Sequence, residues 1–467
     1  MDRHKQLDIL KRQQLSMRGQ IVSAATRRDR IRRVIDVLVT NEKKFVEAMT
    51  EDFGVRPAEQ SQLYDILASI VTLKDAAKHV SKWMKPEKRK VDPMLALMGA
   101  KAHIEFQPKG SVGLLSPWNF PLYLTFTPLA GVLAAGNASM IKPSEHTPAT
   151  SEVMRETLHA AFSPDEIFVI TGDAAVAADF SSLPFDHIIF TGSTPVGRHV
   201  MRAAAENLVP VTLELGGKSP VIIGEAPNSE LMAKRIVTGK LLNAGQICLA
   251  PDYLLVNERD EESVISSLIS AAEGILPDLT NNNDYTSVLG DRNRERLKEY
   301  VNEARTHNAE IIEVGRETAD GRLPFTIIRN CPDNIKVMQD EIFGPVLPII
   351  TYKDLSEAIA FVNDRPRPLG LYFFGTNKSE ERRVLNETVS GGVTLNDVVF
   401  HVTVEDLPFG GVGDSGFGVY HGRDGFKTFS HQKSIFTQSK IDVADLAGLR
   451  PPYGKKIRNY LRKHISQ

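Results

Sequence analysis

After residue 110, short apolar runs of the chain alternate with stretches long enough for helices. The apolar runs at 112–115, 139–141, 167–170, 187–190 and 209–213 predict strands, and the stretches at 121–135, 148–162, 173–179 and 195–206 predict helices. Alternation at this spacing is typical of βαβ units and favours a doubly wound parallel sheet.

Two further regions complete an α/β fold. Residues 1–80 have the pattern of polar amphipathic helices, one of which ends at Gly54. A second alternating series starts at Pro220 and runs to about Asn396, and it predicts another doubly wound parallel sheet. We expect a cofactor domain at 1–212, interrupted by a bridging strand segment near 90–108, and a catalytic domain at 213–412. Residues 413–467 then form a return segment, an oligomerisation strand and a basic tail.

The bridging segment and the oligomerisation strand together predict a small β element, although they are far apart in the sequence. Residues 101–108 and 432–440 both have strand patterns, and they would either pair or extend across the interface of a homodimer. Ordinary edge strands are an equally good interpretation. The tail from Arg450 is basic and amphipathic, which is compatible with an anionic membrane surface, although a helix packed on its own protein is the better expectation.

Composition excludes several classes of function. Charged residues make up 24% of the 467 residues and the net charge is −2, so no polyanion such as a nucleic acid is expected as partner. No secretory signal and no apolar run of the ~18 residues needed for a membrane span are present. The two cysteines are too few for a disulfide framework or a thiolate metal site. A cytoplasmic enzyme with a free thiol and no metal is the expectation.

Cys248 is the candidate nucleophile. A cysteine without context is most often a small buried hydrophobe. Cys248 instead lies in NAGQICLAP, a loop of small and polar residues just after a helix-length stretch, and such a loop can present a thiol. Cys331, at the end of an apolar run, keeps the structural interpretation.

A nucleophilic thiol needs a base and a donor for the oxyanion that it creates. Glu214 ends an apolar strand in VTLELGGKSP, where burial would raise its pKa, as suits a general base. A glutamate at a surface strand end is the alternative. Asn119 lies between Pro117 and Pro121, in a stiff loop that can hold its amide still as an oxyanion donor.

The sequence pattern that predicts a nucleotide-binding site lies at the end of a strand, and not in the G-x-G-x-x-G motif. The G-x-G-x-x-G of Gly411, Gly413 and Gly416 has no βαβ unit around it and is not interpreted as a dinucleotide fingerprint. In FTGSTPVGR a buried strand ends, Gly192 and Ser193 turn, and a helix starts, an arrangement that binds phosphate. Lys142 and Glu145 follow another strand of the same sheet, whose carboxyl edge is where nucleotides bind.

Seven motifs together resemble the aldehyde dehydrogenase superfamily, in its usual order from about residue 40 to 440. They are SPWNFP, MIKPSEHTP, FTGSTPVG, LELGGKSP, NAGQIC, EIFGPV and LPFGGVGDSGFG. The short amino-terminal region and the YHGRDGFKTFSHQKS ending resemble the dimeric class 3 group. Within that group, HVMRAAAENLVPVTLELGGKSP is similar to the coniferyl aldehyde dehydrogenases.

The resemblance implies a role for each matching residue. Cys248 would be the nucleophile, Glu214 the general base, and Asn119 the oxyanion donor together with the backbone N–H of Cys248. The implied activity is NAD(P)-dependent oxidation of an aldehyde, expected to be aromatic and coniferyl-like, through a thiohemiacetal and a thioester. NAD is the expected cofactor, and NADP is possible. The implied cofactor-binding residues are Lys142, Glu145, Gly192, Ser193, Gly197, Glu341, Phe343 and Trp118.

Other functions remain open at this point. A general fatty or aliphatic aldehyde dehydrogenase is the nearest alternative. A CoA-acylating member would have no use for Glu214 as a base for water, and a non-catalytic binding relative would have no reason to keep Cys248, Glu214 and Asn119 together.

Overall fold

The computed structural model describes residues 1–225, 229–278 and 282–465. As the sequence predicts, the amino-terminal region is helical. It contains α1 (Arg3–Met17), α2 (Ala24–Thr40), α3 (Glu42–Phe53), the single turn α4 (Ala58–Gln60), the π-helix η1 (Ser61–Leu67) and α5 (Ala68–Trp83). Helix α3 ends because Gly54 takes a φ of 83°, a left-handed conformation that commonly ends helices.

The first sheet has six strands in the order β15-β7-β6-β3-β4-β5. Its five main strands are parallel, whereas β15 (Gly416–Phe417) is antiparallel to β7. The strands are β3 (Ser111–Leu115), β4 (Ala138–Lys142), β5 (Ile167–Val169), β6 (His187–Thr191) and β7 (Val211–Glu214), and the helices between them are α7 (Tyr123–Ala135), α8 (Pro148–Ala161), α9 (Ala174–Ser181) and α10 (Thr194–Ala205). The predicted doubly wound sheet is confirmed.

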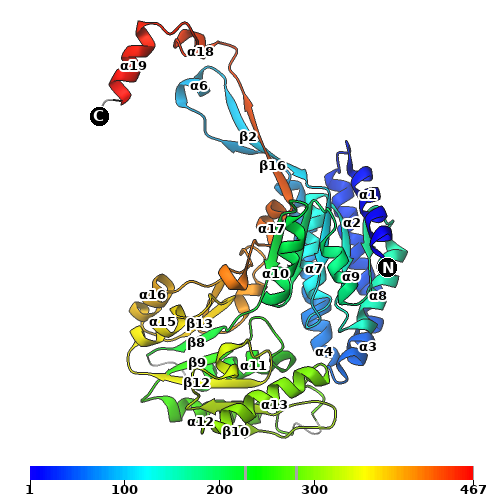
Figure 1. Cartoon of the computed structure of the whole chain (residues 1–467), viewed down its shortest axis with the longest axis vertical. Coiled ribbons are helices and arrows are strands. Elements are labelled where there is room, and N and C mark those ends of the chain that lie inside the picture. Colours follow the sequence, from blue (N-terminus) through cyan, green and yellow to red (C-terminus); the bar gives the residue numbers. More distant parts are fainter. Residues whose placement is uncertain (226–228, 279–281, 466–467) are drawn as a thin grey trace.

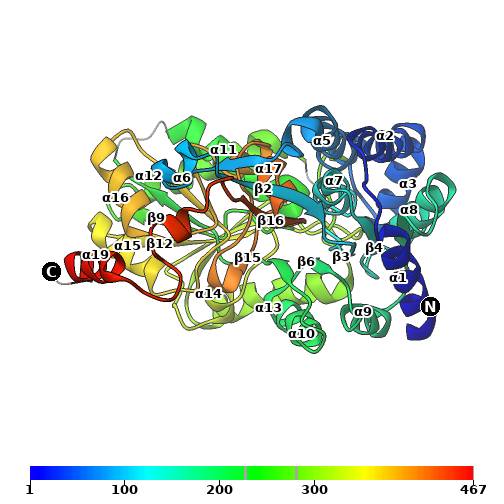
Figure 2. The ribbon, with the colours of Figure 1, turned by 90° about the horizontal axis from the view of Figure 1, so that it is seen from above.

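Helices cover both faces of this sheet, which buries its strands. Figure 2 shows α1, α9 and α10 on one side of the strands and α2, α5 and α7 on the other. The two faces carry separate apolar clusters, one around Leu114 and Leu129 and the other around Leu115 and Phe180. Because both faces are covered, what the sheet exposes is the ends of its strands and the loops there.

The second sheet has seven strands in the order β10-β11-β12-β9-β8-β13-β14, and only its edge pair β10–β11 is antiparallel. The chain passes from the first sheet to the second through residues 215–219, so the expected domain boundary after residue 212 falls inside β7. Cys331 is half-buried against the core of this sheet. The elements are β8 (Pro220–Ile223), α11 (Ser229–Leu241), β9 (Tyr253–Asn257), α12 (Glu261–Ile275), α13 (Asp291–Thr306), β10 (Glu310–Val314), β11 (Phe325–Arg329), α14 (Lys336–Gln339), β12 (Val346–Tyr352), α15 (Leu355–Asn363), β13 (Gly370–Phe374), α16 (Lys378–Glu387) and β14 (Gly392–Leu395).

A third sheet forms an arm that projects from the body (Figure 1). Strand β2 (Lys101–Pro108) lies between β1 (Glu87–Arg89) and β16 (Ser430–Thr437), antiparallel to both. The two distant segments therefore pair, which is one of the alternatives that the sequence left open. The arm also carries α6 (Pro93–Leu97), α18 (Val443–Leu446) and the basic helix α19 (Lys455–Ile465). The last two residues of the predicted basic tail, 466–467, lie outside the described residues.

The glycine-rich string at 411–416 forms no nucleotide-binding turn between a strand and a helix of a βαβ unit. It forms a 3₁₀ turn, Gly413–Ser415, that leads into β15 at the edge of the first sheet. After β15 the chain continues into the short helix α17 (Gly422–Thr428) and then the arm. The interpretation of this motif as unrelated to a dinucleotide fingerprint is confirmed.

Candidate active site

Cys248 follows a turn with an unusual backbone. Helix α11 runs into the 3₁₀ turn η2 (Leu242–Gly245), in which residues 243–245 have φ of 51°, 52° and 74°. Alanine rarely occupies this left-handed region, so the contacts of the turn must hold Ala244 in it. The loop that follows leaves the Cys248 thiol free and half-buried.

The Asn119 side chain is fixed against the same loop. Asn119 follows β3, is buried, and its Nδ2 atom donates a hydrogen bond of 3.1 Å to the backbone carbonyl of Gln246. Gln246 lies two positions before Cys248 in the chain, so the predicted oxyanion donor and the predicted nucleophile are brought together. An amide has two N–H groups, and this bond uses one of them.

Glu214 ends β7 with its carboxylate buried and unpaired. Its side chain is 2% exposed, and neither carboxylate oxygen has a hydrogen-bond partner among residues 1–225, 229–278 and 282–465. Burial raises the pKa of Glu214 well above its ordinary value. Burial also raises the pKa of the Cys248 thiol, and the charges of Glu341 and Glu214 raise it further. In this buried state the pKa of each group is shifted toward its neutral form, and Glu214 lies within electrostatic range of the thiol.

The cofactor candidates meet at the carboxyl edge of the first sheet. The strand order reverses between β3 and β6, and such a switch point is where open α/β sheets bind ligands. The backbone N–H of Gly192 donates to the carbonyl of Glu214 at 3.0 Å, and the N–H of Ser116 donates to the carbonyl of Lys142 at 3.2 Å. These bonds join the loops after the strands into one surface.

The loops after β6 and β4 carry groups that can bind a nucleotide: N–H groups at the start of α10 and the charged side chains of Lys142 and Glu145. Ser193 is exposed and is the N-cap residue of α10, and its side chain makes no capping hydrogen bond. The buried ammonium group of Lys142 donates to the carbonyl of Pro143 at 2.7 Å and lies 3.5 Å from the exposed carboxylate of Glu145. Gly197 has a different position: a Cβ atom there would lie 2.7 Å from Leu215, so this glycine lets α10 pack closely.

Three further cofactor candidates come from other parts of the chain. Glu341 and Phe343 lie in the loop before β12 of the second sheet, and Trp118 lies in the loop after β3. A Cβ atom on Gly216 would lie 2.0 Å from the Glu341 Oε2 atom, so only glycine leaves room for this carboxylate. Burial raises the pKa of Glu341 to about 8, and its Oε1 atom has no partner within the described part of the chain. The rings of Trp118 and Phe343 meet edge to face at 5.3 Å. The unpartnered Glu341 oxygen can accept a hydrogen bond from a ribose hydroxyl, and the ring pair can pack against a flat ring.

Four aromatic residues of the loops around the candidate site differ in exposure. Trp118 and Tyr123 are half-buried, and Phe400 is 61% exposed. Phe409 is buried and packs on Tyr420 and His421, so it supports the lining and offers no free face.

Several residues around the site were not predicted from the sequence. A Cβ atom on Gly410 would lie 3.1 Å from the Glu214 Oε1 atom, and the N–H of Leu215 donates to the carbonyl of Ser415. The hydroxyl of Tyr420 and both ring nitrogens of His421 are buried without hydrogen-bond partners in the described residues. The LPFGGVG motif marked part of this region, but no local pattern pointed to Tyr420 or His421.

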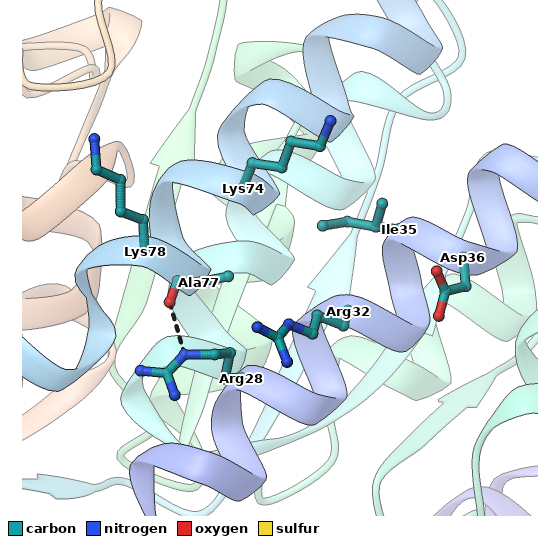
Figure 3. Close-up of a pocket in the computed structure, with 7 residues that line it drawn as sticks. All are labelled: Arg28, Arg32, Ile35, Asp36, Lys74, Ala77 and Lys78. Atoms are coloured by element: carbon teal, nitrogen blue, oxygen red, sulfur yellow. Dashed lines mark hydrogen bonds between the residues drawn. The ribbon is translucent and has the colours of Figure 1, made fainter.

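A separate groove lies on the helical face of the molecule. It has a volume of about 500 Å³, lies between α2 and α5, and shares no lining residue with the candidate site. Figure 3 shows Arg28 of α2 donating to the carbonyl of Ala77 in α5 across it. The groove is lined by Arg28, Arg32, Ile35, Asp36, Lys74, Ala77 and Lys78.

No helix among the described residues is both long and apolar enough to cross a membrane. The same residues hold no group of three or more His, Cys, Asp or Glu side chains that could bind a metal ion.

Known proteins match this chain over most of its length. The profile of the "Aldehyde dehydrogenase family" matches residues 13–435. A "Probable coniferyl aldehyde dehydrogenase" of Caulobacter vibrioides is 50% identical over 100% of this chain and 98% of its own length. The "Coniferyl aldehyde dehydrogenase" of Pseudomonas sp. (strain HR199) is 48% identical over 94% of this chain and 92% of its own.

The fold agrees with these sequence relationships. A solved structure of Staphylococcus aureus AldH in a substrate-bound state superposes with a TM-score of 0.92 at 35% identity, over 98% of this chain and 99% of the other. The protein therefore belongs to the aldehyde dehydrogenase family, whose members are oxidoreductases that act on aldehydes with NAD(P).

Proposed function

We propose that this enzyme oxidises an aromatic aldehyde to the carboxylic acid through a thioester on Cys248, with Asn119 as oxyanion donor and Glu214 as general base. The observation that carries the proposal is the hydrogen bond between the Asn119 amide and the loop of Cys248, with the buried carboxylate of Glu214 within electrostatic range. A nucleophile, a donor and a base in one buried site are the parts that acyl-transfer chemistry needs.

The chemistry follows from these three groups. The Cys248 thiol first gives up its proton, to solvent water or to an ionised Glu214 carboxylate. The resulting thiolate attacks the carbonyl carbon, and the C=O electron pair moves to the oxygen, which accepts hydrogen bonds from Asn119 Nδ2 and the Cys248 N–H. When bound, the nicotinamide ring supplies the hydride acceptor that turns this adduct into a thioester. In its ionised form, Glu214 then takes a proton from water as the water attacks the thioester carbon, and its raised pKa makes this carboxylate the stronger base. The C–S bond breaks, and the acid leaves.

The residues at the strand ends fit a dinucleotide. The free N–H groups at the start of α10, next to Gly192 and Ser193, would bind its pyrophosphate. Lys142 and Glu145 would hold the adenosine ribose, and the orphaned Oε1 of Glu341 would accept from the nicotinamide ribose. We propose NAD as the preferred form, because a 2′-phosphate would meet the negative charge of Glu145.

Two rival activities have distinct signatures. The proposed enzyme makes NADH and acid from aldehyde, NAD and water alone, whereas a CoA-acylating enzyme requires CoA as acceptor. A binding protein makes no NADH under either condition. NADH formation that depends on added CoA would overturn the hydrolytic proposal.

We propose an aromatic, coniferyl-like aldehyde as substrate. The names of the two close relatives support this choice, as do the half-buried rings of Trp118 and Tyr123 beside the site. Each ring that stacks on a planar substrate would contribute ~0.5–1.5 kcal/mol. Initial rates over a panel of cinnamaldehydes, benzaldehydes and alkanals test it: kcat/KM should be highest for the cinnamyl type. A clear preference for hexanal or longer alkanals would leave a fatty-aldehyde enzyme.

We also propose a cytoplasmic homodimer. Strand β16 is an edge strand of the arm, and the arm exposes apolar side chains such as Leu97 at 89% and Phe436 at 54%. Edge strands and exposed apolar groups favour pairing with a second copy. Light scattering on the full chain should give twice the mass of 51.7 kDa, and a monomer at micromolar concentration would contradict it.

A further inference from the structure

A buried arginine joins the two loops that carry Asn119 and Cys248. Arg56 lies between α3 and the π-helix η1, and its side chain is fully buried with that of Asp65. Its Nη1 atom donates to the carbonyl oxygen of Asn119 at 3.1 Å and to the Oδ1 atom of Asn243 at 2.9 Å. One guanidinium nitrogen therefore bonds to both loops.

The guanidinium itself is held on all sides. Its Nη2 atom donates to Asp65 at 2.6 Å and its Nε atom to Ser61 at 3.2 Å. The rings of Phe53 and Phe120 lie 4.4 Å and 5.3 Å from its central carbon. Arginine suits this position because its planar fork presents several donors in a fixed geometry, which lysine cannot do.

The partners of Arg56 are the groups that shape the site. Asn243 is the first left-handed residue of the turn before Cys248, and its Nδ2 atom donates to the carbonyls of Asn119 and Gln246. Asp65 accepts the N–H groups of Leu122 and Tyr123 at 3.0 Å and 3.1 Å, just after the Asn119 loop. Arg56 therefore bonds to both the Asn119 loop and the turn before Cys248, and Asp65 holds the chain just after Asn119.

We propose that Arg56, oriented by Asp65, is a positioning residue that sets the Asn119 amide against the reacting carbonyl at Cys248. Its guanidinium donates to the backbone carbonyl of Asn119, while the backbone carbonyl of Gln246 accepts from the Asn119 side chain. A displacement of about 1 Å at a reacting centre can cost ~10²-fold in rate. The inference rests on the proposed role of Asn119 as oxyanion donor.

The test measures acylation of Cys248 without any cofactor. The thiolate attacks the ester carbonyl of p-nitrophenyl acetate, the C–S bond forms, and p-nitrophenolate leaves with the electron pair of the broken C–O bond. This step creates the same oxyanion and is followed by absorbance. Arg56→Lys should slow the first turnover by ~10- to 100-fold, and Asn119→Ala by ~10²–10³-fold.

A double variant separates positioning from general damage. If Arg56 acts through Asn119, Arg56→Lys/Asn119→Ala should be no slower than Asn119→Ala alone, because effects on one unit do not add. Asp52→Asn is the matched control. Asp52 caps the start of α8 through the N–H groups of Ala149 and Thr150, so this variant should lose stability and keep the acylation rate per folded molecule.

If Arg56→Lys does not fold, Arg56→Met/Asp65→Leu removes both buried charges together. Apolar replacement of a buried ion pair is often neutral for stability, so this variant should fold and still acylate slowly. Near-normal acylation in the Arg56 variants, or multiplied losses in the double variant, overturns the inference while the role of Asn119 stands. A near-normal Asn119→Ala overturns that role and the inference with it.

Discussion

The side-chain amide of Asn119 donates a 3.1 Å hydrogen bond to the backbone carbonyl of Gln246, two residues before Cys248. These residues come from different sheets, since Asn119 follows β3 and Cys248 follows α11. The bond gives the proposed oxyanion donor a fixed direction before any substrate arrives. Preorganised donors of this kind usually supply the largest share of catalysis in acyl transfer.

Removal of the thiol should abolish oxidation and spare cofactor binding. Cys248→Ala cannot form the covalent adduct, while the proposed cofactor residues at the strand ends are untouched. We expect no NADH from any aldehyde and an unchanged Kd for NAD by fluorescence titration or calorimetry. Cys331→Ala is the control, because this half-buried thiol packs on the second sheet and should be dispensable for turnover. Residual NADH formation by Cys248→Ala would refute the assignment.

Glu214→Gln should uncouple acylation from hydrolysis. The glutamine keeps the shape of the side chain but cannot take a proton from water, so steady-state turnover should fall by ~10²–10⁴-fold. Rapid mixing should still show an NADH burst close to one per active site, with label from the aldehyde trapped on Cys248. If Glu214 also deprotonates the thiol, the burst itself slows. Near-normal steady-state turnover would mean that another group activates the water.

The same carboxylate makes stability depend on pH. Burial raises the pKa of folded Glu214 above its ordinary value of 4.5. Between those two pKa values the folded protein keeps a proton that the unfolded chain has lost, so the free energy of unfolding falls as pH rises. Glu214→Gln should therefore melt at a higher Tm than the parent at pH 8, with a difference that shrinks toward pH 4.5. A difference that is constant across pH would exclude titration as its cause.

Cofactor preference should depend on Glu145. Its exposed carboxylate lies 3.5 Å from the Lys142 ammonium, where a 2′-phosphate on the cofactor would be repelled. We expect NAD to exceed NADP in kcat/KM, and Glu145→Gln to narrow the ratio by roughly five-fold, the equivalent of about 1 kcal/mol for an exposed charge. Glu152→Gln, within helix α8 and paired with Arg155, is a control with the same charge change. Equal kcat/KM for both cofactors in the parent would contradict this placement.

Local patterns were enough to predict the strands and helices of the first sheet. Apolar runs such as 187–190 and the helix-length stretches between them must be buried in alternating layers, and burial is encoded residue by residue. The loop that contains Cys248 could be recognised for a similar reason. Small and polar residues around a thiol favour a loop through their local preferences, independently of distant contacts.

The sequence by itself therefore determined the fold class, and it singled out Cys248, Glu214 and the turn at Gly192 as candidates. Only the tertiary structure decided which distant residues meet them. Arg56, 63 residues before Asn119 and 187 before Asn243, carries no local mark of its contacts with both. Likewise Glu341 fits only because Gly216 leaves space. Periodicity records how much of a side chain is buried, whereas a hydrogen bond between loops depends on how the sheets pack, which no short stretch of sequence contains.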